Sequence, residues 1–339
     1  MGTATSPLPS NRRLLLYFVF LAAFLPEAIT GSTPPLAWLN PIQLLLNLWL
    51  YGTGVLVVRE LSLRWRTGWP GILLMGAAYG IIEEGLALVT FFDPTLPQVA
   101  SGSLSWYGRL FGVNWVWAVW LTTFHAIVSI AFPIFLIEWH YPALRGKRLL
   151  SGRGLRVTAL LLALATVTLF VLVSVLSAYV VGGLEYVGAI VIVALLFYAA
   201  RSGVGHLWMR LPTGRMLKRW IFAAGGYAFF ALSFLAYAGA PALGGHPAVT
   251  YLEGGVLLMM ALLLIRRTAS HGDGKRAQFA FVAGSIAFFA TFDFILGLGG
   301  DPRFLGMPLV GLGFLAYVVW LYRARGPERV SVPMAAPIT

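Results

Sequence analysis

The sequence contains no cysteine and few charged residues. Its 339 residues include no Cys, and Asp, Glu, Lys and Arg together make up 11% of them. Without cysteine the chain can form neither a disulfide nor a thiolate metal site. An ordinary soluble domain has about 25% charged residues, so the shortage of charge excludes that class. The chain is instead rich in apolar residues, which make up 59% of it.

Apolar segments long enough to cross a bilayer recur along the whole chain. A transmembrane helix needs about 20 predominantly apolar residues. The segments of this kind are 14–30, 38–58, 70–92, 112–138, 157–180, 184–200, 220–239, 249–265, 278–297 and 305–322. We therefore predict an all-α polytopic membrane protein with about ten transmembrane helices.

These segments predict one transmembrane helical domain, residues 13–323, with a short tail at each end. The polar residues 1–12 predict a disordered cytoplasmic tail, and 324–339 predict a second cytoplasmic tail. Within the domain, the first pair of buried carboxylates falls in 70–140, which we take as the candidate site. The helices of 157–323 are mostly free of ionisable groups and are predicted to be scaffold.

The basic residues indicate which side of the membrane each connection faces. If the N-terminus is inside, all 24 Lys and Arg residues except Arg109 and Arg303 fall in the two tails or in cytoplasmic connections. This is a strong positive-inside pattern, with both termini cytoplasmic. It also explains the net charge of +12 without a nucleic-acid partner. We expect an integral, multi-pass protein of a prokaryotic plasma membrane, surrounded by membrane lipid.

Two adjacent glutamates, Glu83 and Glu84, lie inside the third apolar segment. An ionisable residue at that depth costs roughly 2.5–3.5 kcal/mol and is read as a functional-site hypothesis. Neighbouring residues on an α-helix point about 100° apart, so the two carboxylates are expected on different faces. Glu84 shares a face with Gly76 and Gly80, and small residues at that spacing mark a close helix contact. Tyr79 lies with Glu83 on the adjoining face.

The fourth segment supplies a partner for Glu84. His125 lies near its middle, with Thr122 and Ser129 on the same helix face. The third and fourth helices run antiparallel, so we expect Glu84 and His125 to meet at comparable depth. The alternative is a hydrogen-bonded histidine with a purely structural role.

Two further carboxylates are candidates for the same site. Glu27 follows Pro26 near the outer end of the first segment, and Asp293 lies about one turn from the outer end of the ninth. We expect Pro26 to open the helix so that Glu27 lines an outward-facing cavity. For both carboxylates the alternative is a side chain that reaches water.

Three short motifs resemble those of the CAAX-protease and bacteriocin-processing family of intramembrane endopeptidases. That family has Glu-Glu-x-x-x-Arg on one helix, Phe-x-x-x-His on the next, and His-x-x-x-Asn or Asp on a later one. Here Glu83–Leu88 has the paired glutamates with Leu88 in place of arginine, and Leu121–His125 has the histidine with Leu121 in place of phenylalanine. Phe289–Asp293 has only the acid of the third motif. The resemblance covers about 70–140, with an echo at 278–297, and implies a glutamate-dependent endopeptidase that activates water inside the membrane.

The residues support three functions. The first is a membrane-embedded hydrolase with Glu84 as general base, Glu83 sharing its proton and His125 orienting water, acting on a membrane peptide or a lipid-modified substrate. The second is a proton- or cation-coupled transporter of five plus five helices, whose path includes Glu27 and Asp293. The third is a non-catalytic scaffold. No cofactor is predicted, although carboxylates and a histidine are compatible with a divalent metal.

Overall fold

The computed structural model describes residues 10–96, 105–203, 215–268 and 274–324. These residues form a bundle of helices, with one pair of two-residue strands, β1 (Arg109–Leu110) and β2 (Val113–Asn114), in an outer loop. Short 3₁₀ turns join some of the helices, namely η1 (Pro35–Leu39), η5 (Pro142–Leu144) and η7 (Pro302–Phe304). The predicted all-α membrane fold is confirmed.

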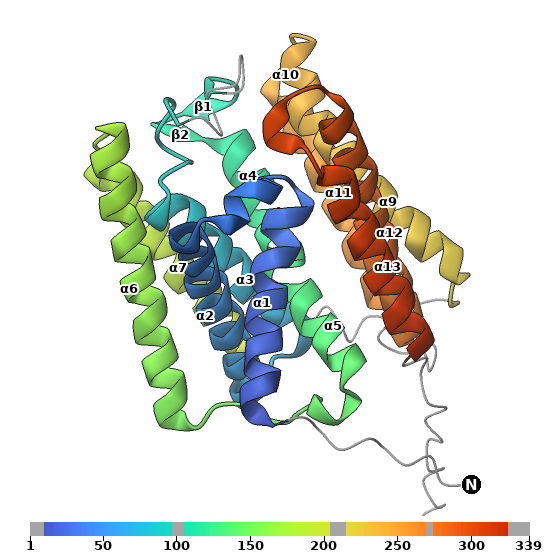
Figure 1. Ribbon diagram of the computed structural model, residues 1–339. Coiled ribbons are helices and arrows are strands. Elements are labelled where there is room, and N and C mark those ends of the chain that lie inside the picture. The colour runs from blue at the N-terminus through green and yellow to red at the C-terminus, as the bar shows by residue number, and fades with distance from the viewer. Residues whose placement is uncertain (1–9, 97–104, 204–214, 269–273, 325–339) are drawn as a thin grey trace, which may run out of the picture.

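The N-terminal part of the chain forms one group of helices (Figure 1). Its elements are α1 (Asn11–Ile29), α2 (Pro41–Trp65), α3 (Gly68–Ile81) continued by the π-helical turn η2 (Ile82–Ala87), then α4 (Trp115–Phe124), the π-helical turn η4 (His125–Ala131) and α5 (Phe132–His140), and finally α6 (Gly152–Ser177) and α7 (Gly183–Ser202). Because α4, η4 and α5 follow one another without a break, they form a single span from Trp115 to His140.

The remaining helices lie together beside this group (Figure 1). They are α9 (Arg219–Phe234) continued by the π-helical turn η6 (Leu235–Gly239) and α10 (Ala240–Ala242), then α11 (Pro247–Arg267), α12 (Gly274–Leu298) and α13 (Met307–Ala324). Among the described residues, therefore, α1–α7 contain six of the predicted spans and α9–α13 contain four. The five-plus-five division of the sequence that the transporter alternative assumes stays a prediction.

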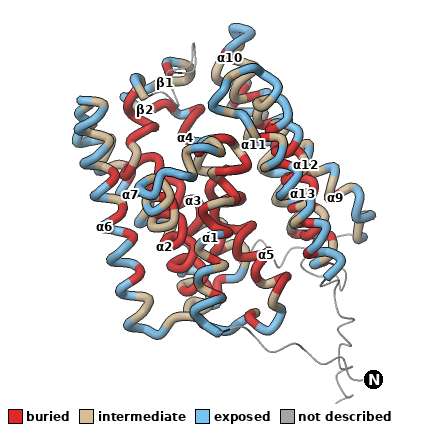
Figure 2. Tube along the Cα trace, in the orientation of Figure 1, coloured by how far each residue is buried: buried red, intermediate tan, exposed pale blue. Residues whose placement is uncertain are grey.

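Each apolar segment of the sequence contains a helix. In the described part of the chain, seven helices are long and apolar enough to cross a membrane. They are Pro41–Trp65, Trp115–His140, Gly152–Ser177, Gly183–Ser202, Arg219–Ala242, Gly274–Leu298 and Pro302–Ala324. The others, α1, α3 with η2, and α11, are shorter or interrupted by polar residues, and α1 and α3 each bury one side against the bundle. Figure 2 shows the buried residues concentrated on α2–α5, whereas α6 and α7 are largely exposed.

The end of the third span departs from its predicted boundary. It was expected to continue to residue 92, but helix ends at Ala87. The amide of Leu88 donates to the carbonyl of Glu83 at 2.8 Å, and Val89 then adopts a left-handed conformation with φ +52°. The amides of the next turn bond to the Val89 carbonyl, so the chain reverses inside the bundle. A left-handed residue is a common way to end a helix.

The predicted tails meet the structure only at their inner ends. α1 begins at Asn11, two residues earlier than the predicted domain boundary. The rest of the N-terminal tail, 1–9, and the C-terminal tail from 325 to 339 lie outside the described residues.

Two glycines allow α3 to pack closely on the fourth span, as their spacing predicted. A Cβ atom added to Gly76 would lie 2.9 Å from the Cα of Ala126, and one added to Gly80 would lie 3.0 Å from the Cβ of His125. Neither glycine could therefore carry a side chain without moving the helices apart. This contact places η2 against η4, and with them the residues of the candidate site.

Charged residues in the C-terminal part of α2 fix the connection between α5 and α6. Arg59 is 1% exposed, lies 3.1 Å from a carboxylate oxygen of Glu138, and donates to the carbonyl of Leu144 at 2.8 Å. Glu60 is fully buried and accepts from the amide of Leu149 at 2.6 Å. Each buried charge thus has a partner, which is the condition for burying it at acceptable cost. The network ties α2 to α5 and thereby orients the helix that carries the site.

The α3–η4 contact predicts the effect of a single methyl group. Gly76→Ala should lower the free energy of unfolding by about 1–3 kcal/mol, because the new Cβ would overlap the Ala126 backbone. Thermal unfolding in detergent measures this. Gly188→Ala in α7 is the matched control, since a Cβ there meets no atom within 4 Å. Equal stability of the two variants would contradict the close contact.

Candidate functional site

Two carboxylates and one imidazole meet where η2 packs on η4. An oxygen of Glu84 lies 3.1 Å from Nε2 of His125, and an oxygen of Glu83 lies 3.1 Å from Nδ1 of the same ring. The exposed fractions are 1% for Glu83, 8% for Glu84 and 2% for His125. One potential ligand atom from each residue lies within 4.8 Å of the other two. The structure therefore brings together the three residues that the sequence proposed as catalytic.

The geometry of η2 corrects one expectation about the two glutamates. In an α-helix they would point about 100° apart, and only Glu84 was expected to face the bundle. Both belong to a π-helical turn, and their carboxylates reach opposite nitrogens of one ring. His125 is itself the first residue of a π-helical turn, and such turns occur frequently at functional sites.

The second oxygen of Glu84 is held by residues that sequence reasoning missed. It accepts a hydrogen bond from the hydroxyl of Thr90, which in turn accepts from the indole nitrogen of Trp117 at 3.0 Å. Thr90 is only 2% exposed and reaches Glu84 because the chain reverses after Ala87. The sequence predicted a helix through this position, so it contained no signal for the contact.

The Nδ1 side of His125 has two neighbours. The hydroxyl oxygen of Ser129 lies 2.8 Å from Nδ1, one turn along the same span, as the spacing of the two residues suggested. The other neighbour is Glu83. Thr122, proposed with Ser129 as a supporting residue, is half-buried, and its backbone packs beside Gly80. Its contribution is close helix packing.

Two tyrosine rings complete the surroundings of the imidazole. The ring of Tyr79, a predicted supporting residue, is 6.2 Å from that of His125, and the ring of Tyr51 is 6.3 Å away on α2. Both tyrosines are buried. Tyr51 was missed because an uncharged tyrosine in an apolar segment carries no cost of buried charge that would single it out.

Tyr51 connects the group to Glu27. Its hydroxyl donates to one carboxylate oxygen of Glu27 at 2.6 Å, and Thr33 donates to the other at 2.5 Å. Asn47 donates to the Thr33 oxygen at 3.0 Å. Contrary to expectation, α1 continues through Pro26 to Ile29, although proline within a helix removes a backbone donor and crowds the preceding turn. Glu27 thus points to α2 from an intact helix.

Asp293 is the one predicted site residue that lies elsewhere. It is fully buried in α12, where a Cβ on Gly311 of α13 would lie 2.9 Å from one of its carboxylate oxygens. Among the described residues neither of these oxygens has a hydrogen-bond partner, and no contact joins Asp293 to the glutamate–histidine group. Asp293 is therefore not part of the glutamate–histidine group, and its side chain does not reach water.

The donor set is compatible with either of two kinds of chemistry. Glutamate oxygens and an imidazole nitrogen are ligands that Zn²⁺ and similar divalent metals take. The same three groups can instead share protons, since each carboxylate faces a ring nitrogen that either donates or accepts. In both cases Ser129 orients the His125 ring through Nδ1, and Thr90 orients the carboxylate of Glu84.

Comparison with known proteins identifies a family. Residues 15–300 match a family described as an uncharacterized membrane protein family, and this region includes every residue of the group around His125. Comparison with curated proteins and with solved structures gave no match. The resemblance to the CAAX-protease and bacteriocin-processing family stays a prediction from the motifs.

The hydrogen bond from Thr90 predicts a measurable loss of stability. Thr90→Val keeps the shape of the side chain but leaves a buried carboxylate oxygen of Glu84 without its donor, so unfolding should become easier by about 1.5–3 kcal/mol. The control is Thr53→Val in α2, because the buried Thr53 hydroxyl donates only to backbone carbonyls of its own helix. Unfolding of both variants in detergent is compared with wild type. A Thr90 variant as stable as the control would show that Glu84 does not depend on this donor.

Proposed function

The chain belongs to this uncharacterized membrane protein family, and we propose that it is a membrane-embedded hydrolase that activates water at Glu84. One observation carries the proposal: a buried imidazole has a carboxylate 3.1 Å from each of its two nitrogens. General acid–base catalysis needs a group that takes a proton and a second group that holds it within hydrogen-bond reach. Glu84 and His125 meet this requirement.

The three groups have different roles. Glu84 has the largest exposed fraction of the three, so it is the carboxylate that water reaches. Each of its oxygens has one contact in the structure, to His125 or to Thr90, and each retains a lone pair for a water molecule. Glu84 takes a proton from that water, and Nε2 of His125 exchanges the proton with it. Glu83 and Ser129 hold the ring through Nδ1.

The group can change its proton content without losing its contacts. With both ring nitrogens protonated, Nε2 donates to Glu84 and Nδ1 donates to the hydroxyl oxygen of Ser129, while a Glu83 oxygen lies 3.1 Å from Nδ1; with one proton fewer, Glu84 and the ring share a proton. Repulsion between two carboxylates in a low-dielectric interior favours states in which such a proton is held. The loss and return of one proton is what hydrolysis of an amide or ester requires, first to activate water and then to protonate the leaving group.

The substrate class follows from the position of the group. It lies inside a bundle whose outer helices expose large apolar residues, as on α6. A peptide that enters from the membrane, or one that carries a lipid modification, can approach this region. We therefore propose a membrane-inserted or lipid-modified peptide as the substrate.

A cleavage assay in proteoliposomes tests this function. The probes are a fluorogenic peptide with one transmembrane segment and a lipid-modified fluorogenic peptide. Glu84→Gln and His125→Ala should each lower the cleavage rate by roughly 10²–10⁴-fold, since each removes an acid–base group. Glu185→Gln, at the start of α7, is the control and should cleave as wild type does. Cleavage by the Glu84 and His125 variants at the wild-type rate would exclude the mechanism, and a chelator arm reports whether a divalent metal takes part.

A second function, a proton relay, has its own supporting observation. The ring of Tyr51 lies 6.3 Å from that of His125, and its hydroxyl donates to Glu27, which is hydrogen-bonded to Thr33 and through it to Asn47. Chains of carboxylates, histidines and hydroxyl groups conduct protons in membrane transporters. Such a chain would serve proton-coupled transport rather than hydrolysis.

Proton flux separates the two functions. In liposomes loaded with a pH-sensitive dye, Glu27→Gln and Tyr51→Phe should slow the dissipation of an imposed pH gradient if the relay operates, because each removes a link of the chain. Gln43→Leu serves as the control, since Gln43 bonds to Asn47 beyond Glu27. Flux equal to that of protein-free liposomes in the wild type would eliminate the relay and leave hydrolysis untouched.

A further inference from the structure

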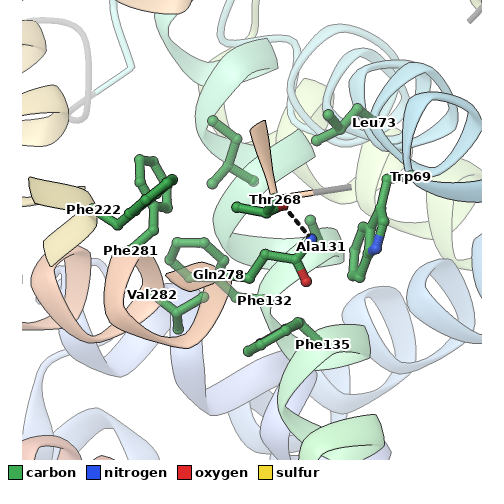
Figure 3. Close-up of a pocket in the computed structure, with 11 residues that line it drawn as sticks. Trp69, Leu73, Ala131, Phe132, Phe135, Phe222, Thr268, Gln278, Phe281 and Val282 are labelled. Carbon is green, nitrogen blue, oxygen red and sulfur yellow. Dashed lines mark hydrogen bonds between the residues drawn. The ribbon is translucent and has the colours of Figure 1, made fainter. Parts of the chain in front are cut away.

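A second feature lies apart from the glutamate–histidine group, between the two groups of helices. It is an open, apolar pocket. Figure 3 shows its lining residues, which come from α3, the fourth span, α9, α12 and the end of α11. They are Trp69, Leu73, Ile127, Ala131, Phe132, Phe135, Phe222, Thr268, Gln278, Phe281 and Val282. None of them is a residue of the proposed hydrolytic group.

The walls of the pocket select an apolar ligand. All but two of its lining residues are hydrophobic. The two polar ones satisfy each other, because the side-chain amide of Gln278 donates to the hydroxyl of Thr268 at 2.7 Å (Figure 3). A ligand that brought its own polar groups inside would lose their hydration and find few partners. A hydrocarbon chain loses nothing of this kind and gains about 0.8 kcal/mol per buried CH₂.

The mouth of the pocket lies at the basic end of the bundle. Trp69, Leu73 and Gln278 are the lining residues that are half-buried, whereas the others are buried. Lys275 comes one turn before Gln278 on α12, and Lys218 comes one turn before Phe222 on α9; both lysines are exposed. The described residues at these helix ends, 215–219, 266–268 and 274–276, include five further basic residues and no acidic one. Basic residues near a membrane surface attract anionic lipid headgroups.

From the apolar walls and the basic mouth we propose that this pocket binds one acyl chain of an anionic phospholipid, whose phosphate lies at Lys218 and Lys275. The acyl chain fills the space between Trp69 and Leu73 on α3 and Val282 on α12. The lipid comes from the leaflet that faces the basic end of the bundle. This proposal does not depend on hydrolysis.

A bound acyl chain would contact both groups of helices. Its walls belong partly to α3 and η4 and partly to α9 and α12, which Figure 1 shows in separate groups. Ile127 and Ala131 are residues of η4, the turn that begins with His125. Lipid occupancy should therefore stabilise the two groups against each other and support the turn that carries the imidazole.

Lipid binding by delipidated, detergent-solubilised full-length protein tests the proposal. Phosphatidylglycerol is added, retained lipid is counted by native mass spectrometry, and thermal unfolding is followed. The wild type should retain one lipid and unfold at a higher temperature with it. Val282→Phe and Leu73→Trp fill the pocket from opposite sides, and each should lose the retained lipid and its stabilising effect. Val157→Phe and Leu160→Trp make the same changes at exposed positions of α6 and should behave as wild type does.

The headgroup is tested separately. Lys218→Gln and Lys275→Gln should each weaken phosphatidylglycerol binding by roughly fivefold, as expected for loss of one lysine near an anionic surface. Lys147→Gln, exposed in another basic connection, is the control. Phosphatidylcholine bound as tightly as phosphatidylglycerol would overturn the anionic specificity. Lipid retained equally by the wild type and both filling variants would overturn the pocket as its site. Both results are read from lipid binding and not from peptide cleavage, so the failure of one proposal can be told from the failure of the other.

Discussion

The rest of the structure depends on the close approach of α3 to the fourth span. Gly76 and Gly80 leave no side chain between the two backbones, and the site lies one turn beyond them. At that separation the carboxylates of Glu83 and Glu84 can reach the two nitrogens of His125. Three ionisable groups that would each be costly in the membrane interior thereby lie together, each carboxylate 3.1 Å from a ring nitrogen. Without the contact each would be a buried charge without a partner.

Irregular helix geometry recurs where the polar groups are placed. The glutamates lie in η2, the imidazole begins η4, and a third π-helical turn, η6, carries Tyr237. The ring of Tyr237 stacks on that of Trp120 at 5.3 Å, so the C-terminal helices contact the fourth span close to the site. A π-helical turn weakens local hydrogen bonding, so tertiary contacts must stabilise it. Here they come from the packing of η2 on η4 and from the partners of Glu84.

The two proposed sites share one structural element. The fourth span presents His125 and Ser129 to α3 on one side, and Phe132 and Phe135 to the apolar pocket on another. Its residues belong to both of the large apolar cores, the one formed with α2 and α3 and the one formed with α9 and α12. The span is thus the common wall between the two groups of helices. The packing of the two groups therefore acts on the span that carries the imidazole.

Local physical chemistry made much of this protein predictable. The apolar segments located the helices, because a bilayer requires a minimum apolar length. The cost of burying charge identified Glu83, Glu84 and His125, and the spacing of Gly76 and Gly80 located the close contact. Each of these inferences uses the residues of one segment, or of two segments joined by a single loop. They needed no knowledge of how distant helices pack.

The tertiary structure decided what depends on geometry that the sequence does not encode locally. Helical periodicity of about 100° per residue placed the two glutamates on different faces, whereas in the structure both carboxylates reach one ring. The turn after Ala87 places Thr90 against Glu84, and the packing of α2 places Tyr51 against Glu27. Neither residue stands out in its own segment. Asp293, like Glu27, is a carboxylate near the outer end of an apolar segment, yet packing placed it against α13. The sequence alone determined which residues are costly to bury; only the packing of distant helices decided which of them share that cost.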